Sequence, residues 1–241
     1  MNRRSRWLLH PAVIYLILLI LIILISWIGS VIEIKHSSGN TDLAIRSALG
    51  ASGVRWAVRS AADCLRNAPM GNAIMLFLTI GVFKGCGAQR ALLNYKSLSP
   101  KERTSLHLGL IVLIVCIVVV ILGLFAGSRL LLSVTGRLHG SPLFDGFIFL
   151  LLLTVAVPSL VYGFSSDNIR NLNDCMNAFA SMAVQMTHFI ITLLVAAQLI
   201  QVIEYTNLYQ FVGLSANAFR YIAFIVYWLP LPVIMYMYRG L

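Results

Sequence analysis

From Ser141 to Met182 the chain reads SPLFDGFIFLLLLTVAVPSLVYGFSSDNIRNLNDCMNAFASM. The residues from Phe147 to Val161 are mostly apolar, and Pro158 is the one helix-breaking residue among them. Water cannot solvate such a run as a surface, so burial in lipid is its most favourable environment. The segment from Ser165 to Asp174 is polar, and a second apolar run follows Met182. This stretch therefore predicts a helix entrance, a membrane crossing, a short polar turn and the start of a second crossing.

The composition indicates an integral membrane protein. Hydrophobic residues make up 59% of the chain and charged residues 11%, whereas soluble domains carry about 25% charged residues. The formal net charge of +10 is spread over the connecting segments, which is typical of topology signals and lipid headgroup contacts. We therefore expect the lipid bilayer as a partner, and no nucleic acid.

Six apolar segments are long enough to be considered as crossings. We predict an all-α polytopic membrane helix bundle with crossings over Ala12–Ile32, Ala68–Phe83, Leu106–Phe125, Leu143–Phe164, Met182–Ile203 and Phe219–Tyr238. The N-terminal cations Arg3, Arg4 and Arg6 and the cationic loop from Lys84 to Arg103 place both termini in the cytoplasm by the positive-inside rule. We expect one transmembrane domain over residues 1–241.

Two shorter segments carry local signals. Ser99-Pro100-Lys101-Glu102 predicts a helix N-cap with proline at the first helical position. The connection from Glu33 to Asn67 mixes cations with apolar residues, and part of it is expected to form an interfacial amphipathic helix. Five cations in this connection lie on the side of the membrane that should carry fewer of them, which is the weakest point of the predicted orientation.

One polar stripe falls inside a predicted crossing. Ser181, Gln185, His188 and Thr192 are spaced i, i+4, i+7 and i+11, which keeps them on one face of a helix. Gln185, His188 and Thr192 are therefore candidate substrate-binding residues facing a cavity. The alternative is a packing role, with a neutral His188 bonded to a neighbouring helix and Gln185 holding the bundle together.

The second candidate site is the entrance to the second crossing. Asn67 and Asn72 surround Pro69-Met70-Gly71, and the backbone N–H groups of a helix start could receive a substrate carboxylate. The alternative is plain helix capping with close helix packing. Gln198 and Gln201 lie on the face opposite His188, so we interpret them as interhelical hydrogen bonds.

The sequence contains no motif typical of enzymes or of metal sites. No GxSxG, HExxH, Walker or GxGxxG motif occurs, and the four cysteines have no metal-type spacing. We therefore expect no enzyme activity, no cofactor and no metal site. None of the eight acidic residues lies in the middle third of a predicted crossing, whereas ion-coupled carriers usually bury a carboxylate there.

Several strings in the chain resemble the AbgT-type transporter family in the family's order. They are Arg55-Trp56, Asn67 to Gly71, Ile80-Gly81-Val82, Ser99 to Arg103, Ser141 to Gly146, Pro158 through Tyr162-Gly163, Ala180-Ser181-Met182 and Ala196-Ala197-Gln198. The resemblance implies a homodimeric inner-membrane carrier of aminobenzoyl-glutamate or related organic anions, driven by a coupling cation. It also implies two halves of inverted topology, each with a re-entrant hairpin at the substrate site.

The chain departs from that family in length. It resembles a first-half remnant over residues 1–98 and a second-half remnant over 99–241, without the segments similar to the two hairpins. We carry over no binding residue from the family for this reason. Two functions remain open at this stage: a reduced secondary transporter, and a transport-incompetent dimeric membrane scaffold or regulatory subunit.

Overall fold

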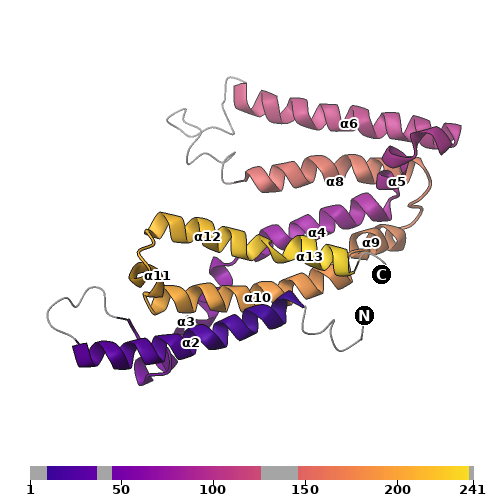
Figure 1. The fold of residues 1–241 in the computed structure, drawn as a ribbon. Coiled ribbons are helices and arrows are strands. Elements are labelled where there is room, and N and C mark those ends of the chain that lie inside the picture. The colour runs from indigo at the N-terminus through magenta and orange to yellow at the C-terminus, as the bar shows by residue number, and fades with distance from the viewer. Residues whose placement is uncertain (1–9, 37–44, 126–145, 239–241) are drawn as a thin grey trace. The chain divides into compact units, whose positions relative to one another are not determined.

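A computed structural model of residues 1–241 describes residues 10–36, 45–125 and 146–238, and every regular element in these ranges is a helix (Figure 1). The α-helices are α2 (Pro11–His36), α3 (Ala51–Asn67), α4 (Met70–Gly85), α5 (Ala88–Leu93), α6 (Pro100–Phe125), α8 (Phe147–Ser165), α9 (Leu172–Ala180), α10 (Ala183–Tyr205), α11 (Leu208–Phe211), α12 (Ala216–Trp228) and α13 (Pro230–Met237). The predicted entrance Ser141–Asp145 and the cations Arg3, Arg4 and Arg6 lie outside the described residues.

The prediction of an all-α polytopic membrane protein is confirmed. Five segments of the described chain are long and apolar enough to cross a membrane: Pro11–Ile32, Pro100–Gly123, Phe147–Ser165, Ala183–Tyr205 and Ala216–Met237. The second predicted crossing, Ala68–Phe83, corresponds to α4, an apolar helix of 16 residues, which is shorter than the roughly 20 residues that span a bilayer perpendicularly.

The predicted helix start at Ser99 is confirmed as a reciprocal cap. The Ser99 hydroxyl oxygen accepts the backbone N–H of Glu102 at 3.3 Å, and the Glu102 carboxylate accepts the backbone N–H of Ser99 at 2.9 Å. Pro100 is the first residue of α6, where its missing N–H leaves no intrahelical hydrogen bond unmade. The cap fixes where α6 begins.

Two predicted crossings differ from the structure. The last one is two helices, because α12 ends at Trp228 and α13 begins at Pro230, whose ring cannot continue the hydrogen-bond ladder of the preceding turn. The fifth crossing is preceded by the separate short helix α9, which begins with a capping box between Asn171 and Asp174. That box is visible in the sequence, whereas the predicted polar turn extends to Asp174, which is the third residue of α9.

The chain divides into two compact units. The first contains residues 1–70 and 187–241, and the second contains residues 71–186. This division differs from the predicted halves 1–98 and 99–241, and the single transmembrane domain stays a prediction.

In the first unit, α2 and α3 pack against the C-terminal helices. The Tyr15 hydroxyl donates to the backbone carbonyl of Val226 at 2.7 Å, which ties α2 to α12. Trp56 stacks on Tyr205 with ring centroids 4.3 Å apart, which ties α3 to the end of α10. The predicted amphipathic segment is therefore α3, whose buried face carries Trp56 and Cys64 and whose exposed face carries arginines.

In the second unit, α4 packs closely against α9 through two glycines. A Cβ atom added at Gly81 would lie 2.7 Å from the Phe179 carbonyl oxygen, and one added at Gly85 would lie 2.5 Å from the Ala178 Cα atom. The Ser181 hydroxyl also donates to the Gly81 carbonyl at 2.8 Å. The Gly-x-x-x-Gly spacing thus removes the side chains that would hold these two helices apart.

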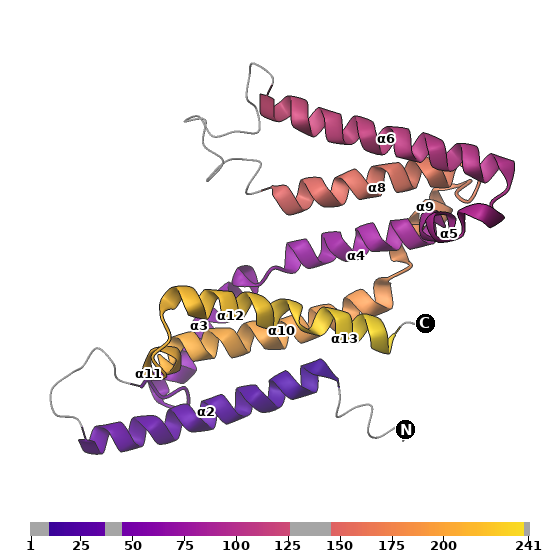
Figure 2. The ribbon, with the colours of Figure 1, turned by 45° about the horizontal axis from the view of Figure 1, so that its top comes forward.

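The loop between α8 and α9 is fixed to the other helices of the second unit. Asp167, which has a left-handed backbone with φ 60°, pairs with Lys101 at the start of α6. The Asn168 side chain donates to the Cys86 carbonyl at 2.9 Å. Figures 1 and 2 show α6 and α8 side by side, with α5 at the end where this loop lies.

Candidate functional site

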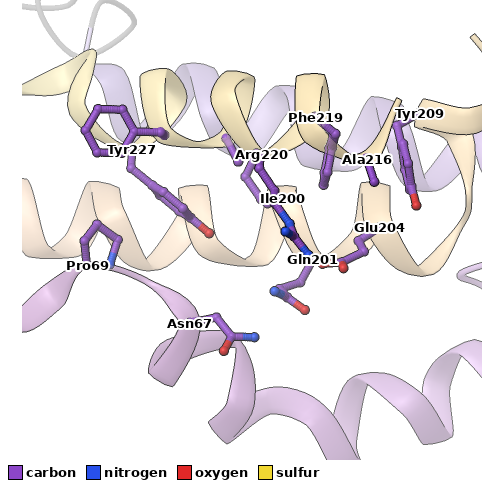
Figure 3. Close-up of a pocket in the computed structure, with 12 residues that line it drawn as sticks. Asn67, Pro69, Ile200, Gln201, Glu204, Tyr209, Ala216, Phe219, Arg220 and Tyr227 are labelled. Carbon is purple, nitrogen blue, oxygen red and sulfur yellow. The ribbon is translucent and has the colours of Figure 1, made fainter. Parts of the chain in front are cut away.

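A cavity of about 690 Å³ lies within the first unit (Figure 3). Four elements supply its walls: the end of α3 with the residues after it, the last turns of α10, α11, and α12. The lining side chains are Asn67, Pro69, Ile200, Gln201, Glu204, Tyr209, Ala216, Phe219, Arg220, Ala223, Phe224 and Tyr227. Its volume falls within the range of about 300–1,000 Å³ that is usual for small-molecule sites.

Helical spacing places the polar side chains of the cavity. Gln201 and Glu204 are three residues apart on α10, so they lie on the same face of that helix, and Figure 3 shows both on the cavity side. Arg220 reaches toward them from α12, and Asn67 is the last residue of α3. The cavity therefore combines a guanidinium, a carboxylate and two amides.

Aromatic side chains form the other part of the wall. The rings of Tyr209 and Phe219 are stacked with centroids 4.6 Å apart, and Phe224 and Tyr227 lie further along α12. Phe219 and Tyr227 are each 8% exposed, so packing holds them in place. Flat apolar surfaces beside a guanidinium suit a ligand with an aromatic ring and an acidic group.

The start of α12 also faces the cavity. Ala216, its first residue, is part of the lining, and the Ser215 hydroxyl accepts the backbone N–H of Ala218 at 3.3 Å. The N-terminal end of a helix carries a partial positive charge. This end adds to the positive charge of Arg220 in the same cavity.

The structure separates the two asparagines that the sequence places around Pro69. Asn67 lines the cavity. Asn72 is an exposed residue of α4 in the second unit. Helix α4, which carries Asn72, begins at Met70, whose backbone N–H donates to the Ala68 carbonyl at 2.8 Å. Of the five predicted site residues, Asn67 alone is part of this lining within the described chain.

His188 lies in an aromatic cluster of the first unit. Its ring stacks on Tyr238 with centroids 4.2 Å apart, and the Tyr238 hydroxyl is 3.4 Å from its Nδ1 atom. The His10 ring lies 5.4 Å from it, centroid to centroid. Burial lowers the pKa of His10, and the neighbouring His188 lowers it further, so His10 favours its neutral form in the folded protein.

The remaining members of the predicted stripe are buried or bonded to backbone. Thr192 is fully buried and donates to the His188 carbonyl at 2.9 Å within α10. Gln185 is 5% exposed. Ser181 lies in the turn before α10 rather than on the helix. The hydroxyl groups of Thr192 and Ser181 therefore donate to backbone carbonyls.

Sequence reasoning missed three polar residues of the cavity, namely Gln201, Glu204 and Arg220. The sequence predicts an interhelical hydrogen bond for Gln201, and Glu204 lies just beyond the predicted fifth crossing, which ends at Ile203. The available signal was the pair of polar residues at i and i+3 on α10, together with an arginine in the second turn of an apolar helix. No group of three metal-ligating side chains lies within the described ranges.

Comparisons with known proteins agree with this architecture. Residues 88–235, more than half of the chain, match the model of the AbgT putative transporter family. The solved structure of Neisseria gonorrhoeae MtrF, described as illuminating a class of antimetabolite efflux pumps, superimposes with a TM-score of 0.75. That match has 14% sequence identity and covers 98% of this chain and 83% of the MtrF chain. A search of curated proteins finds no match. The family match over more than half of the sequence shows that the chain belongs to the AbgT transporter family.

Proposed function

We propose that this protein is a secondary transporter of aminobenzoyl-glutamate or related organic anions across the cytoplasmic membrane, driven by a cation gradient. The observation that carries the proposal is the cavity of the first unit, which places Arg220 beside aromatic walls. Membership of a transporter family and the likeness to an efflux pump support transport as the activity.

Each part of such a substrate has a matching group in the cavity. A guanidinium can bind a carboxylate through two parallel N–H donors, so Arg220 is the proposed anion anchor. Asn67 and Gln201 can hydrogen-bond an amide, and the stacked rings of Tyr209 and Phe219 offer a surface for a benzoyl ring. Glu204 can accept a hydrogen bond from an amino group of the substrate.

The proposal is tested by flux of labelled aminobenzoyl-glutamate into liposomes that carry the purified protein, with and without an imposed proton or sodium gradient. Arg220→Gln should reduce gradient-dependent flux at least tenfold, because a hydrogen-bonded charge pair contributes about 1.5–3 kcal/mol. Arg59→Gln is the matched control, since Arg59 is an exposed arginine of the same unit on α3. Equal flux in both variants contradicts the assignment of the cavity.

His188 also remains a proposed substrate-binding residue. His188→Ala should abolish flux while leaving the yield and the mass of the homodimer unchanged. Loss of folded protein in this variant supports the packing role, which the stacking on Tyr238 favours.

The second candidate is a dimeric membrane scaffold or regulatory subunit without transport. The full burial of Thr192 and its hydrogen bond within α10 favour this reading of the predicted stripe. If protein that is folded, and dimeric by light scattering, produces no flux, this result supports the scaffold function and rejects the transporter function.

A further inference from the structure

An apolar groove of about 270 Å³ lies in the second unit, between α5, α6 and α8. Helix α6 contributes Leu106, Gly109, Leu110 and Leu113, which follow the i, i+3, i+4, i+7 spacing of one helix face. These residues fall inside the candidate membrane span of α6. Figure 1 shows the three helices side by side at this place.

The groove offers almost no hydrogen-bonding groups. On α8 its lining includes Val155, Ser159 and Tyr162. The Ser159 hydroxyl donates to the Val155 carbonyl at 2.7 Å, so its proton is used inside the helix. Because α8 also lies in a candidate span, the groove suits the hydrocarbon chain of a lipid.

One end of the groove carries positive charge. Arg103 precedes Leu106 by three residues and therefore continues the groove-lining face of α6 toward its N-terminus. One guanidinium nitrogen donates to the Lys96 carbonyl at 3.0 Å, and the guanidinium carbon lies 5.5 Å from the centroid of the Tyr95 ring. The Tyr95 hydroxyl is 3.2 Å from the Nε2 atom of His107. We name Tyr95, Lys96, Arg103 and His107 the headgroup cluster.

Two acidic residues of the second unit have hydrogen-bond or ion-pair partners outside the cluster. Glu102 accepts hydrogen bonds from Ser99, and Asp167 pairs with Lys101. All four residues of the headgroup cluster are exposed. Arg103 has five N–H donors, so donors remain for an anion after its bond to the Lys96 carbonyl.

We propose that the groove and the headgroup cluster together bind one anionic phospholipid. An acyl chain lies in the groove, and the phosphate accepts hydrogen bonds from Arg103 and Lys96. The depth agrees with this placement, because the candidate span of α6 begins at Pro100, next to the cluster and at the level where lipid headgroups lie. The site is separate from the transport cavity and does not depend on the proposed substrate.

Native mass spectrometry of the purified protein in mixed micelles of dioleoyl phosphatidylglycerol and dioleoyl phosphatidylcholine tests the charge of the site. The wild type should retain one phosphatidylglycerol in preference to phosphatidylcholine. Arg103→Gln should lower this preference about fivefold, since each cation near anionic lipid contributes about 1 kcal/mol. Lys96→Gln combined with Arg103→Gln should lower it about 25-fold.

Arg55→Gln is the matched control for charge. Arg55 is also exposed and also donates one hydrogen bond of 3.0 Å to a backbone carbonyl, but it lies on α3 in the first unit. The control should keep the wild-type preference. An equal loss in Arg55→Gln and Arg103→Gln shows general attraction to anionic micelles and overturns the site.

The apolar part of the site has its own test. Val155→Phe places a larger side chain in the groove and should reduce retention of both lipids, with folding verified by size-exclusion chromatography. Glycerophosphoglycerol, the headgroup without acyl chains, should not displace the retained lipid. Three results overturn the proposal. Glycerophosphoglycerol displaces the retained lipid, the Val155→Phe variant retains as much lipid as wild type, or the mass spectrum shows only lipid-free dimers.

Discussion

Gly81→Ala should destabilise the second unit by about 1–3 kcal/mol, the usual cost of overpacking a close contact. The added Cβ would lie 2.7 Å from the Phe179 carbonyl oxygen, whereas ordinary contacts begin at 3.4 Å. The difference, 3.4 − 2.7, requires α4 and α9 to move apart by 0.7 Å. This movement also stretches the 2.8 Å hydrogen bond from Ser181 to the Gly81 carbonyl.

The helix preference of alanine opposes this effect and needs a control. Replacing glycine by alanine inside a helix stabilises it by about 0.5–1 kcal/mol when nothing else changes. Gly71 provides the control, because it lies on α4 as well and a Cβ added there meets no atom within 4 Å. Gly71→Ala should therefore be neutral or stabilising.

Both variants are compared with wild type by equilibrium unfolding in mixed detergent micelles, followed by far-ultraviolet circular dichroism. The close packing of α4 on α9 is refuted if Gly81→Ala unfolds at the same denaturant concentration as wild type. It is equally refuted if Gly71→Ala loses as much stability as Gly81→Ala. Gly85→Ala, whose Cβ would lie 2.5 Å from the Ala178 Cα atom, should repeat the loss.

Three further predictions concern a cap, a titration and the orientation. Ser99→Ala should lower the free energy of unfolding by about 1 kcal/mol in the same assay, because it removes the N-cap of α6. Ser99→Asp should recover the lost stability. A Ser99→Ala variant as stable as wild type rejects the cap. Burial and a neighbouring imidazole lower the pKa of His10 below 6.5, so the folded state binds fewer protons than the unfolded state. The stability contribution is therefore complete above pH 6.5 and is lost as the pH falls through the lowered value; His10→Gln should flatten the acid side of an unfolding-against-pH profile, and an unchanged slope contradicts this. With both termini in the cytoplasm, an impermeant maleimide should label Arg59→Cys in intact cells and Lys96→Cys only after permeabilisation, in a background without other cysteines. The reverse pattern inverts the orientation.

The native cysteines cannot serve for that orientation test. The Cys64 side chain, on α3, is 1% exposed. Burial raises its pKa above the usual value, so its thiolate is scarce as well as inaccessible. Poor labelling of Cys64 would therefore report burial and not membrane sidedness.

Local signals in the sequence were enough to predict the long membrane helices of this fold and the start of α6. The long apolar runs predicted membrane helices, because a water-exposed helix cannot be apolar over so many consecutive residues. Ser99 and Glu102 predicted the start of α6, since a reciprocal cap needs only residues that are three apart. The same kind of signal at Asn171 and Asp174 would have predicted α9.

The tertiary structure alone decided which polar side chains meet. Helical periodicity gives the face on which Gln201 and Glu204 lie, but it does not say which helix covers that face. Arg220 comes from α12 and Asn67 from the end of α3, and no sequence spacing relates residues so far apart. A membrane helix is apolar on every face, so apolar residues do not select its neighbours. The pairing of such helices depends on shape and on a few small or polar residues. For this reason the sequence by itself determined the membrane class and the start of α6, whereas the cavity came from packing.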